Sequence, residues 1–264
     1  MVHQSWFGIR YYDDHQKLVG VNGTFAIELY GNDHVASDVV VFSSQTGLIT
    51  TGGANVVEGL HTWNDATLQG GHGIVVQARS TRLDKVYLDY TSLVIDDPTH
   101  VSVSNSFFLG MGNIVLRSVE TGAVDGLVLD ANTWANYNMP ANRTVVLDER
   151  GGRPFHKVTD FIMTSNVGDD SGAHPMLPAA VTATKTLTLK SSKRFDFNFS
   201  DVFLFPSLGI ASARYSIQIE GTEFAQHALR PAEGQTIAVE TDKAVSATVV
   251  VTATQGTFTA GNNW

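Results

Sequence analysis

IVVQARSTRLDKVYLDYTSLVIDDPTHVSVSNSFFLGMGNIVLRS (74–118) is the stretch that decides the fold class. It contains three short apolar runs that begin 19 and 21 residues apart: IVVQA (74–78), LVIDD (93–97) and IVLRS (114–118). Two earlier runs, AIELYG (26–31) and LITTG (48–52), extend the series with spacings of 22 and 26 residues. The first half of the chain is therefore a repeat with a period near 21.

A second series of runs lies between the members of the first. Its spacings are 22, 26, 20 and 21 residues: VASDVVVF (35–42), VEGLHTWN (57–64), LDKVYLDY (83–90), VSNSFFLG (103–110) and VDGLVLDA (124–131). Both series share one longer interval, so they repeat together. A leucine-rich repeat needs Leu and Asn at fixed offsets, which this chain lacks, and a β-sandwich would not keep a register over five units. The period predicts a parallel β-helix, in which stacked turns form a continuous core.

The composition agrees with a strand-rich fold. The 264 residues include 30 Val and 26 Thr but no Cys, and no run approaches the roughly 20 apolar residues of a membrane span. The net charge is −8 over residues 1–134 and −1 over residues 135–264, with no basic stripe. These features disfavour a helical bundle, a membrane protein, a Cys-based zinc site and a nucleic-acid partner.

The pattern changes in the second half. Residues 144–149 and 158–166 could form one irregular final rung of the β-helix. From residue 181 the chain alternates apolar and polar residues in Thr-rich runs, as antiparallel strands do. The sequence therefore predicts an all-β protein with a β-helix over 1–180 and a β-sandwich-like domain over 181–264.

Strand alternation places part of each repeat on the outer surface. One outward column is polar and includes Tyr30, Thr51, Gln77, Asp96 and Arg117. Neighbours in this column lie one rung apart, a spacing that suits the successive sugars of an oligosaccharide. Asp96 and Arg117 could form an ordinary surface ion pair, or a catalytic carboxylate beside a substrate-binding cation. The residues leave both interpretations open.

The longest interval of the repeat, between the runs at 48–52 and 74–78, contains further candidate site residues. Trp63 could stack on a sugar or cover the end of the core, and His61 shares a column with aromatic residues, which favours a structural role. His72 lies between two glycines and is either catalytic or part of a turn. Three Asp-Asp pairs lack the spaced ligand set of a calcium site, so we expect solvated turns and no bound metal. They are Asp13-Asp14, Asp96-Asp97 and Asp169-Asp170.

Four segments resemble the pectin-lyase-like superfamily, in particular its branch of QUARTET-type polygalacturonases. They are residues 30–64, 82–110, 185–207 and 227–251. The resemblance implies a right-handed β-helix, secretion and inverting hydrolysis of polygalacturonate. It also implies that the family's N-terminal part is missing, so that a preceding segment or another chain covers the first rung. No signal peptide is visible at the N-terminus.

The motifs of polygalacturonases are matched in part. Gly71-His72-Gly73 matches the Gly-His-Gly motif, and Asn32-Asp33 matches Asn-x-Asp loosely. Thr50-Thr51 stands where Asp-Asp is due, and Ser106-Phe107 stands where Arg-x-Lys is due. Glu28 lies three rungs from Asp96, too far to complete a carboxylate pair, which would need Asp33, Asp65 or a missing segment. The acidity of the first half also opposes a polyanionic substrate.

The sequence thus supports two functions: a polygalacturonase-like glycoside hydrolase, or a non-catalytic glycan-binding or structural module. For both, the partner is a polysaccharide, with no cofactor, nucleic acid or membrane. The candidate catalytic residues are Asp96, His72 and Arg117. The candidate substrate-binding residues are Tyr30, Gln77 and Trp63.

Overall fold

The computed structural model describes residues 6–7, 9–12, 18–22, 25–42, 46–63, 72–110, 112–135, 144–151, 153–168, 180–222 and 224–256. These residues form strands and turns, with no helix among them. The chain divides into two compact units, one of residues 1–154 and 160–178 and the other of residues 155–159 and 179–264. Each unit is described here by itself. No helix in the described residues has the length and apolar character needed to span a membrane.

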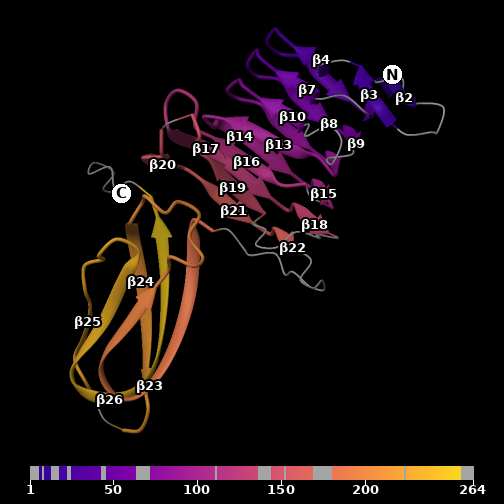
Figure 1. Cartoon of the computed structure of the whole chain (residues 1–264). Coiled ribbons are helices and arrows are strands. Elements are labelled where there is room, and N and C mark those ends of the chain that lie inside the picture. Colours follow the sequence, from indigo (N-terminus) through magenta and orange to yellow (C-terminus); the bar gives the residue numbers. More distant parts are fainter. Residues whose placement is uncertain are drawn as a thin grey trace. The chain divides into compact units, whose positions relative to one another are not determined.

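Three stacked parallel sheets make up the first unit (Figure 1). Sheet 1 consists, in order, of β4 (Phe25–Leu29), β7 (Thr46–Thr50), β10 (His72–Val76), β13 (Ser92–Asp96), β16 (Ile114–Arg117) and β19 (Val145–Asp148). Sheet 2 of this unit consists of β5 (Val35–Ser37), β8 (Val56–Glu58), β11 (Arg82–Asp84), β14 (Thr99–Ser104) and β17 (Ala123–Asp130), with β21 (Ile162–Thr164) paired to β17. β20 (Lys157–Thr159) belongs to the second unit. The chain passes from sheet 1 to sheet 2 to sheet 3 and back again.

Sheet 3 consists of β1 (Trp6–Phe7), β6 (Val40–Phe42), β9 (His61–Trp63), β12 (Tyr87–Asp89), β15 (Phe107–Leu109), β18 (Thr133–Ala135) and β22 (Val167–Gly168). A separate antiparallel hairpin joins β2 (Ile9–Tyr12) and β3 (Leu18–Asn22). Every pairing within the three sheets is parallel between successive turns of the chain, which is the pattern of a parallel β-helix. The fold class predicted from the repeat is confirmed.

The apolar positions of the repeat form the core. Leu48, Ile74, Leu93 and Ile114 pair with one another in sheet 1, and all four have no exposed surface. Inside sheet 3, the Phe108 and Trp134 rings stack with centroids 4.8 Å apart. Because each repeat buries its apolar residues only against its neighbours, the register of the repeat fixes the stack.

The turn from sheet 2 to sheet 3 has the same conformation in every rung. Its central residue has a positive φ throughout: Asp38, Gly59, Lys85, Asn105, Ala131 and Ser165. The backbone N–H of this residue donates to the next rung, as from Lys85 to the Ser104 carbonyl at 3.1 Å. The backbone hydrogen bonds between rungs therefore continue through the turn, although residues other than glycine adopt this left-handed conformation only at a cost.

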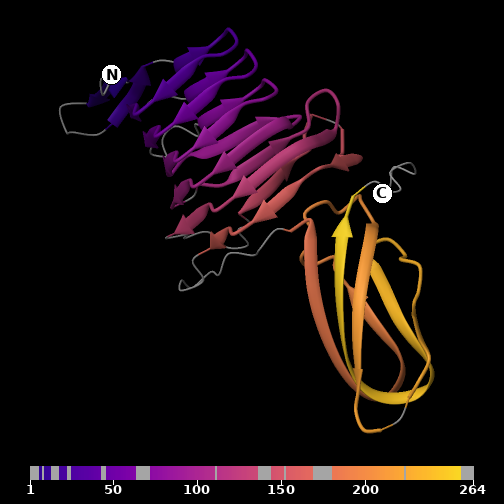
Figure 2. The same ribbon diagram turned by 180° about the vertical axis from the view of Figure 1, so that it is seen from behind.

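The second unit is built around one antiparallel sheet of four strands (Figure 2). They are β23 (Thr182–Asn198), β24 (Ile210–Ile219), β25 (His227–Leu229) and β26 (Thr236–Gln255). The sequence pattern predicts separate strands at 182–190 and 195–205, and again at 236–241 and 246–254, but β23 and β26 each continue across the break between the two runs. Register shifts between Leu189 and Arg194, with φ +51° at Ser191, let β23 change its pairing without ending. Phe195, Val249 and Val251 are fully buried in its core.

Candidate functional site

The predicted outward column exists at one end of the sheet 1 strands. Asp96 pairs with Arg117 in the strand register, and Val76 pairs with both Thr50 and Ile95, which places Gln77 between Thr51 and Asp96. The column is therefore a ladder of polar residues on successive rungs, which we call the polar ladder.

Arg117 holds Asp96 with two hydrogen bonds. Its Nε donates to Asp96 Oδ1 at 2.6 Å and its Nη2 donates to Oδ2 at 2.8 Å. Gln77 Nε2 adds a third hydrogen bond to Oδ2 at 3.3 Å. The Asp96 side chain is 11% exposed and that of Arg117 is 32% exposed. The hydrogen bonds to Asp96 raise the pKa of Arg117, so the guanidinium keeps its positive charge near neutral pH.

The ladder contains a second carboxylate, that of Asp148. It follows Leu147 in β19 and pairs with Arg117 in the register. Arg150 donates to Asp148 Oδ1 at 2.9 Å and to Oδ2 at 2.8 Å. Hydrogen bonds from Arg150 and the positive charge of Arg117 lower the pKa of Asp148 to about 2. Asp96, Arg117 and Asp148 thus alternate in charge on successive rungs of the ladder, and Arg150, two residues after Asp148, pairs with that carboxylate.

Sequence reasoning missed Asp148 because residues 144–149 were expected to be irregular. The signal was present: VVLD (145–148) has the same order of inward and outward residues as IVLR (114–117). Asp96 and Asp148 are two rungs apart, which separates their backbones by about 10 Å at the strand spacing. An inverting glycosidase uses two carboxyl groups about 6.5–9.5 Å apart, so side chains leaning toward Arg117 would approach that range.

His72 lies on the same sheet, in β10. Its Nδ1 is buried without a hydrogen-bond partner in the described structure. Burial lowers the pKa of His72, the charge of Arg117 lowers it further, and Asp96 and Asp148 oppose this. By register, however, His72 pairs with Thr46 and Ser92 at the start of the sheet 1 strands, whereas Asp96 and Arg117 lie at the other end, so the structure does not join the three predicted catalytic residues into one contact cluster. Gly73 is glycine for packing, because a Cβ there would overlap Leu88.

Two outward positions of sheet 1 are not accessible. Val75 and Val94 point outward by register, yet they are only 5% and 1% exposed. Tyr30, in contrast, is 81% exposed after the end of β4. Gln77 and Arg117 of the polar ladder are also at least partly exposed, whereas the centre of this face at Val75 and Val94 is covered.

Asp97 has a structural contact instead of a free carboxylate. It accepts hydrogen bonds from the backbone amides of Val119, Glu120, Thr121 and Gly122 at 2.6–3.3 Å. Burial by itself would raise the pKa of Asp97, but these amides outweigh it and the pKa is lowered. Asp13-Asp14 and Asp169-Asp170 lie outside the described residues. Within those residues, no group of three or more His, Asp or Glu side chains is arranged to hold a metal ion.

A groove follows the corner between sheet 1 and sheet 2, next to the polar ladder. It consists of three hollows of about 440, 330 and 480 Å³ that share lining residues. The first is lined by Asp96 and Arg79, the second by Arg79, Asp33 and His100, and the third by His100 and Arg82. We call this run of hollows the corner groove.

Trp63 and His61 belong to another surface, on sheet 3. Trp63 contacts Phe42, with ring centroids 5.9 Å apart, and His61 stacks on Tyr87 at 4.2 Å with an interplanar angle of 4°. Burial lowers the pKa of His61. The structure thus groups Gln77, Asp96 and Arg117 but places Trp63 on a different sheet. Asp65 lies outside the described residues.

A plant protein is similar in sequence to most of the chain. Polygalacturonase QRT3 from Arabidopsis thaliana is 32% identical over 235 residues. The chain is a polygalacturonase-like member of the pectin-lyase-like superfamily. The match covers 88% of this chain and 47% of the relative, so this polygalacturonase-like chain spans about half the length of that protein. No protein-family model and no solved structure matches it.

Proposed function

We propose that this polygalacturonase-like protein binds an acidic cell-wall polysaccharide, such as pectin, along the corner groove and hydrolyses it with inversion. The proposed setting is extracellular, as for a secreted protein that acts on such a polymer. The relationship to a polygalacturonase supports the substrate class, and the groove beside the polar ladder supports the place.

The observation that carries the proposal is a pair of arginines without a structural partner. Arg117, Arg150 and Arg153 each donate hydrogen bonds within the protein. The side chains of Arg79 and Arg82 are exposed and make no hydrogen bond or ion pair in the described structure, and both residues line the corner groove. Guanidinium groups bind carboxylates with two hydrogen bonds. Arg79 and Arg82 therefore provide a local binding site for a polyuronate on a unit that is acidic as a whole.

The polar ladder supplies the carboxylates for hydrolysis. The pKa of Asp148, about 2, keeps it ionised at any physiological pH, as the group that receives a proton from the attacking water must be. Asp96 then remains as the proton donor to the leaving glycosidic oxygen. Before Asp96 can donate a proton, it must take one up. This requires Arg117 to give up at least one of its two hydrogen bonds to the Asp96 carboxylate. A substrate carboxylate that competes for Arg117 would cause that release.

The same contacts favour a second candidate, a glycan-binding module without catalysis. A carboxylate held by two hydrogen bonds from Arg117 is stabilised in its ionised form, and an ionised carboxylate cannot act as a general acid. If Arg117 never releases Asp96, the groove would bind the polysaccharide and leave it intact.

Reducing ends released from polygalacturonate separate these candidates. We expect wild-type protein to release them, and Asp96→Asn and Asp148→Asn each to slow release by at least about 100-fold, since general acid–base catalysis contributes that much or more. Arg79→Ala and Arg82→Ala should weaken polygalacturonate binding, more strongly at low salt than at high salt.

Arg214→Ala is the matched control, because Arg214 is also exposed but lies in the second unit. It should change neither binding nor release. Binding without release by the wild type would establish the module and reject the hydrolase. Release that is unaffected by both aspartate variants would reject this site.

A further inference from the structure

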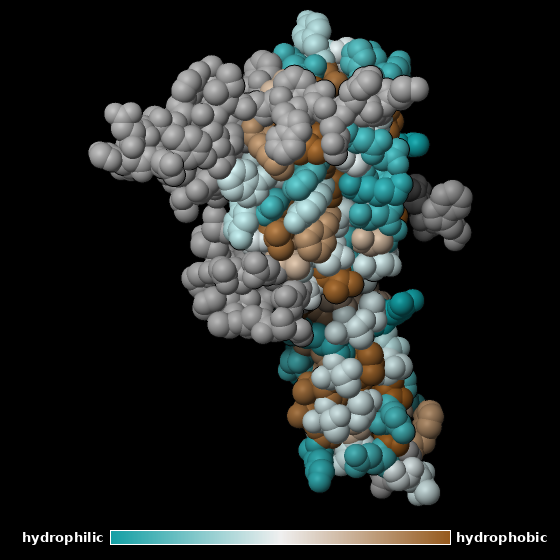
Figure 3. Space-filling view, turned by 90° about the vertical axis from the view of Figure 1, so that its right-hand side faces the viewer, coloured by the Kyte–Doolittle hydropathy of each residue, from teal (hydrophilic) through white to brown (hydrophobic). Residues whose placement is uncertain are grey.

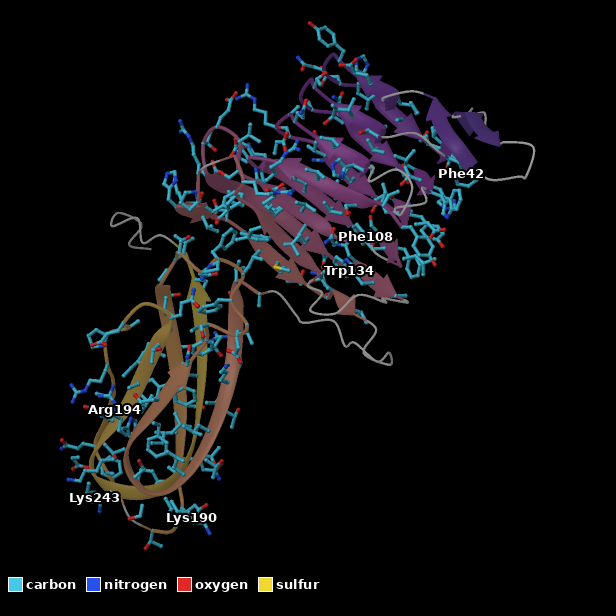
Figure 4. The ribbon with its side chains drawn as sticks, in the orientation of Figure 1. Phe42, Phe108, Trp134, Lys190, Arg194 and Lys243 are labelled. Carbon is cyan, nitrogen blue, oxygen red and sulfur yellow. The ribbon has the colours of Figure 1, made fainter. Side chains whose placement is uncertain are left out.

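The outer surface of sheet 3 carries a row of aromatic side chains. They occupy successive rungs and are all partly exposed: Phe42, His61, Trp63, Tyr87 and Phe107. We call this set the aromatic face. Figure 4 labels Phe42 on it, whereas the labelled Phe108 and Trp134 belong to the buried stack inside the sheet.

The rings of the aromatic face touch one another along the stack. Phe42 meets His61 with centroids 5.4 Å apart, His61 stacks on Tyr87 at 4.2 Å, and Tyr87 meets Phe107 edge-on at 5.2 Å. The row therefore runs across four rungs, about 14 Å at the strand spacing. Figure 3 views the side of the molecule that carries sheet 3 and shows apolar side chains at its surface among hydrophilic ones.

A carboxyl group without a partner lies within this face. Asp89 follows Trp63 in the outward column of sheet 3 and precedes Leu109. Its Oδ1 is buried and accepts no hydrogen bond in the described structure. His61 Nε2, one rung away, is also buried and unpartnered. A buried polar atom without a partner is costly, and such atoms are commonly reserved for a ligand or water.

The charges around Asp89 restrict what the ligand can be. The outward residues of sheet 3 from β6 to β18 include no Lys or Arg. The titratable residues in the neighbouring register positions include His61 and Tyr87, and burial raises the pKa of Tyr87, with the charges of Asp89 and Tyr90 raising it further. Burial raises the pKa of Asp89, which is consistent with a site that does not favour added negative charge.

We propose that the aromatic face is a second glycan-binding site, specific for neutral pyranose sugars. Trp63 and Tyr87 provide apolar ring faces for the C–H groups of a sugar, and the partly exposed carboxyl group of Asp89 accepts hydrogen bonds from its hydroxyls. A uronate would meet a carboxyl group and no cation here. This site is on a different sheet from the corner groove, and its ligand class does not depend on the hydrolysis proposed there.

Calorimetric titration with three hexasaccharides tests the proposal: cellohexaose, β-1,4-linked galactohexaose and hexagalacturonate. We expect saturable binding of at least one neutral hexasaccharide. Trp63→Ala and Asp89→Leu should each weaken that binding about tenfold or more. Asp89→Leu should leave the melting temperature unchanged or higher, because it replaces an unpaired buried oxygen with an apolar group of similar size.

Weaker binding without a lower melting temperature in Asp89→Leu distinguishes a ligand site from a structural stack of rings. This test remains valid even if Trp63→Ala fails to fold. Phe224→Ala, at an aromatic residue 83% exposed in the second unit, is the matched control and should bind like the wild type. The proposal is overturned if neither neutral hexasaccharide binds, if Asp89→Leu binds it like the wild type, or if Asp89→Leu loses hexagalacturonate binding instead.

Discussion

At the scale of single residues, the alternating charges of the polar ladder decide which acid stays ionised. Asp148 is 15% exposed and has Arg150 on one side and Arg117 on the preceding rung. Arg117 also forms an ion pair with Asp96, which lies on the rung before that of Arg117. A carboxylate between two guanidinium groups loses its proton more readily than one in water. The residues proposed to act in hydrolysis therefore also affect the stability of the protein at low pH.

We predict that Asp148 contributes to stability above pH 4 and that this contribution is lost as the pH falls toward 2. Its pKa is about 2 in the folded protein, against an ordinary value near 3.9, so the folded state binds this proton only at lower pH than the unfolded state does. Asp148→Asn should be less stable than the wild type at pH 5, and the difference should shrink between pH 4 and pH 2. Urea unfolding at several pH values measures both.

Asp33→Asn serves as the control, because Asp33 is exposed and makes no ion pair in the described structure. Its stability difference from the wild type should vary less over the same pH range. A constant difference between wild type and Asp148→Asn down to pH 2 would contradict the assignment.

At the scale of elements, the turn between sheet 2 and sheet 3 stores conformational strain. Ala131 has φ +53°, and its N–H donates to the Thr164 carbonyl at 3.1 Å. A non-glycine residue in this region costs roughly 1–2 kcal/mol, whereas glycine adopts it freely. Five of the six described turns of this column have a residue other than glycine at this position. They adopt the conformation because the backbone hydrogen bonds between neighbouring rungs require it.

We predict that Ala131→Gly raises the free energy of unfolding by up to about 1 kcal/mol. Relief of the left-handed strain outweighs the extra chain entropy of glycine in the unfolded state. Thermal unfolding should show a rise of a few degrees at most. Ala36→Gly, in strand β5, should lower stability instead, because glycine weakens a strand interior. A loss of stability in Ala131→Gly would contradict the strain argument.

At the scale of the whole molecule, the two compact units have separate cores. Phe195 lies in the core of the second unit, with Phe197, Phe199 and Val249. The buried Trp134 lies in the first unit. Each unit therefore has the apolar core that an independently folding domain requires.

We predict that the second unit unfolds separately from the β-helix. Phe195→Ala should destabilise the second unit by about 3–5 kcal/mol, the usual cost of removing a buried ring. Differential scanning calorimetry should then show one transition shifted and one unchanged. Trp6, Trp63 and Trp134 are in the first unit, so tryptophan fluorescence should follow mainly the unchanged transition. A single transition shifted as a whole would show that the units unfold together.

The sequence by itself determined the β-helix, its inward columns and the neighbours of Asp96. Repeat spacing and strand alternation are local properties, and parallel stacking turns them directly into contacts, as with Gln77, Asp96 and Arg117. It did not determine the continuous strands of the second unit, since a bulge such as that at Ser191 lets one strand continue across an apparent break.

Only the tertiary structure decided which polar groups are already paired. Asp97 and Asp96 are adjacent and chemically equal in sequence, yet one binds four backbone amides and the other binds Arg117. Likewise, Arg79 remains without a partner and Asp148 enters the ladder. Hydrogen bonds between rungs join residues about 20 or more apart in the chain, and their strength depends on distance and burial, which no sequence pattern contains.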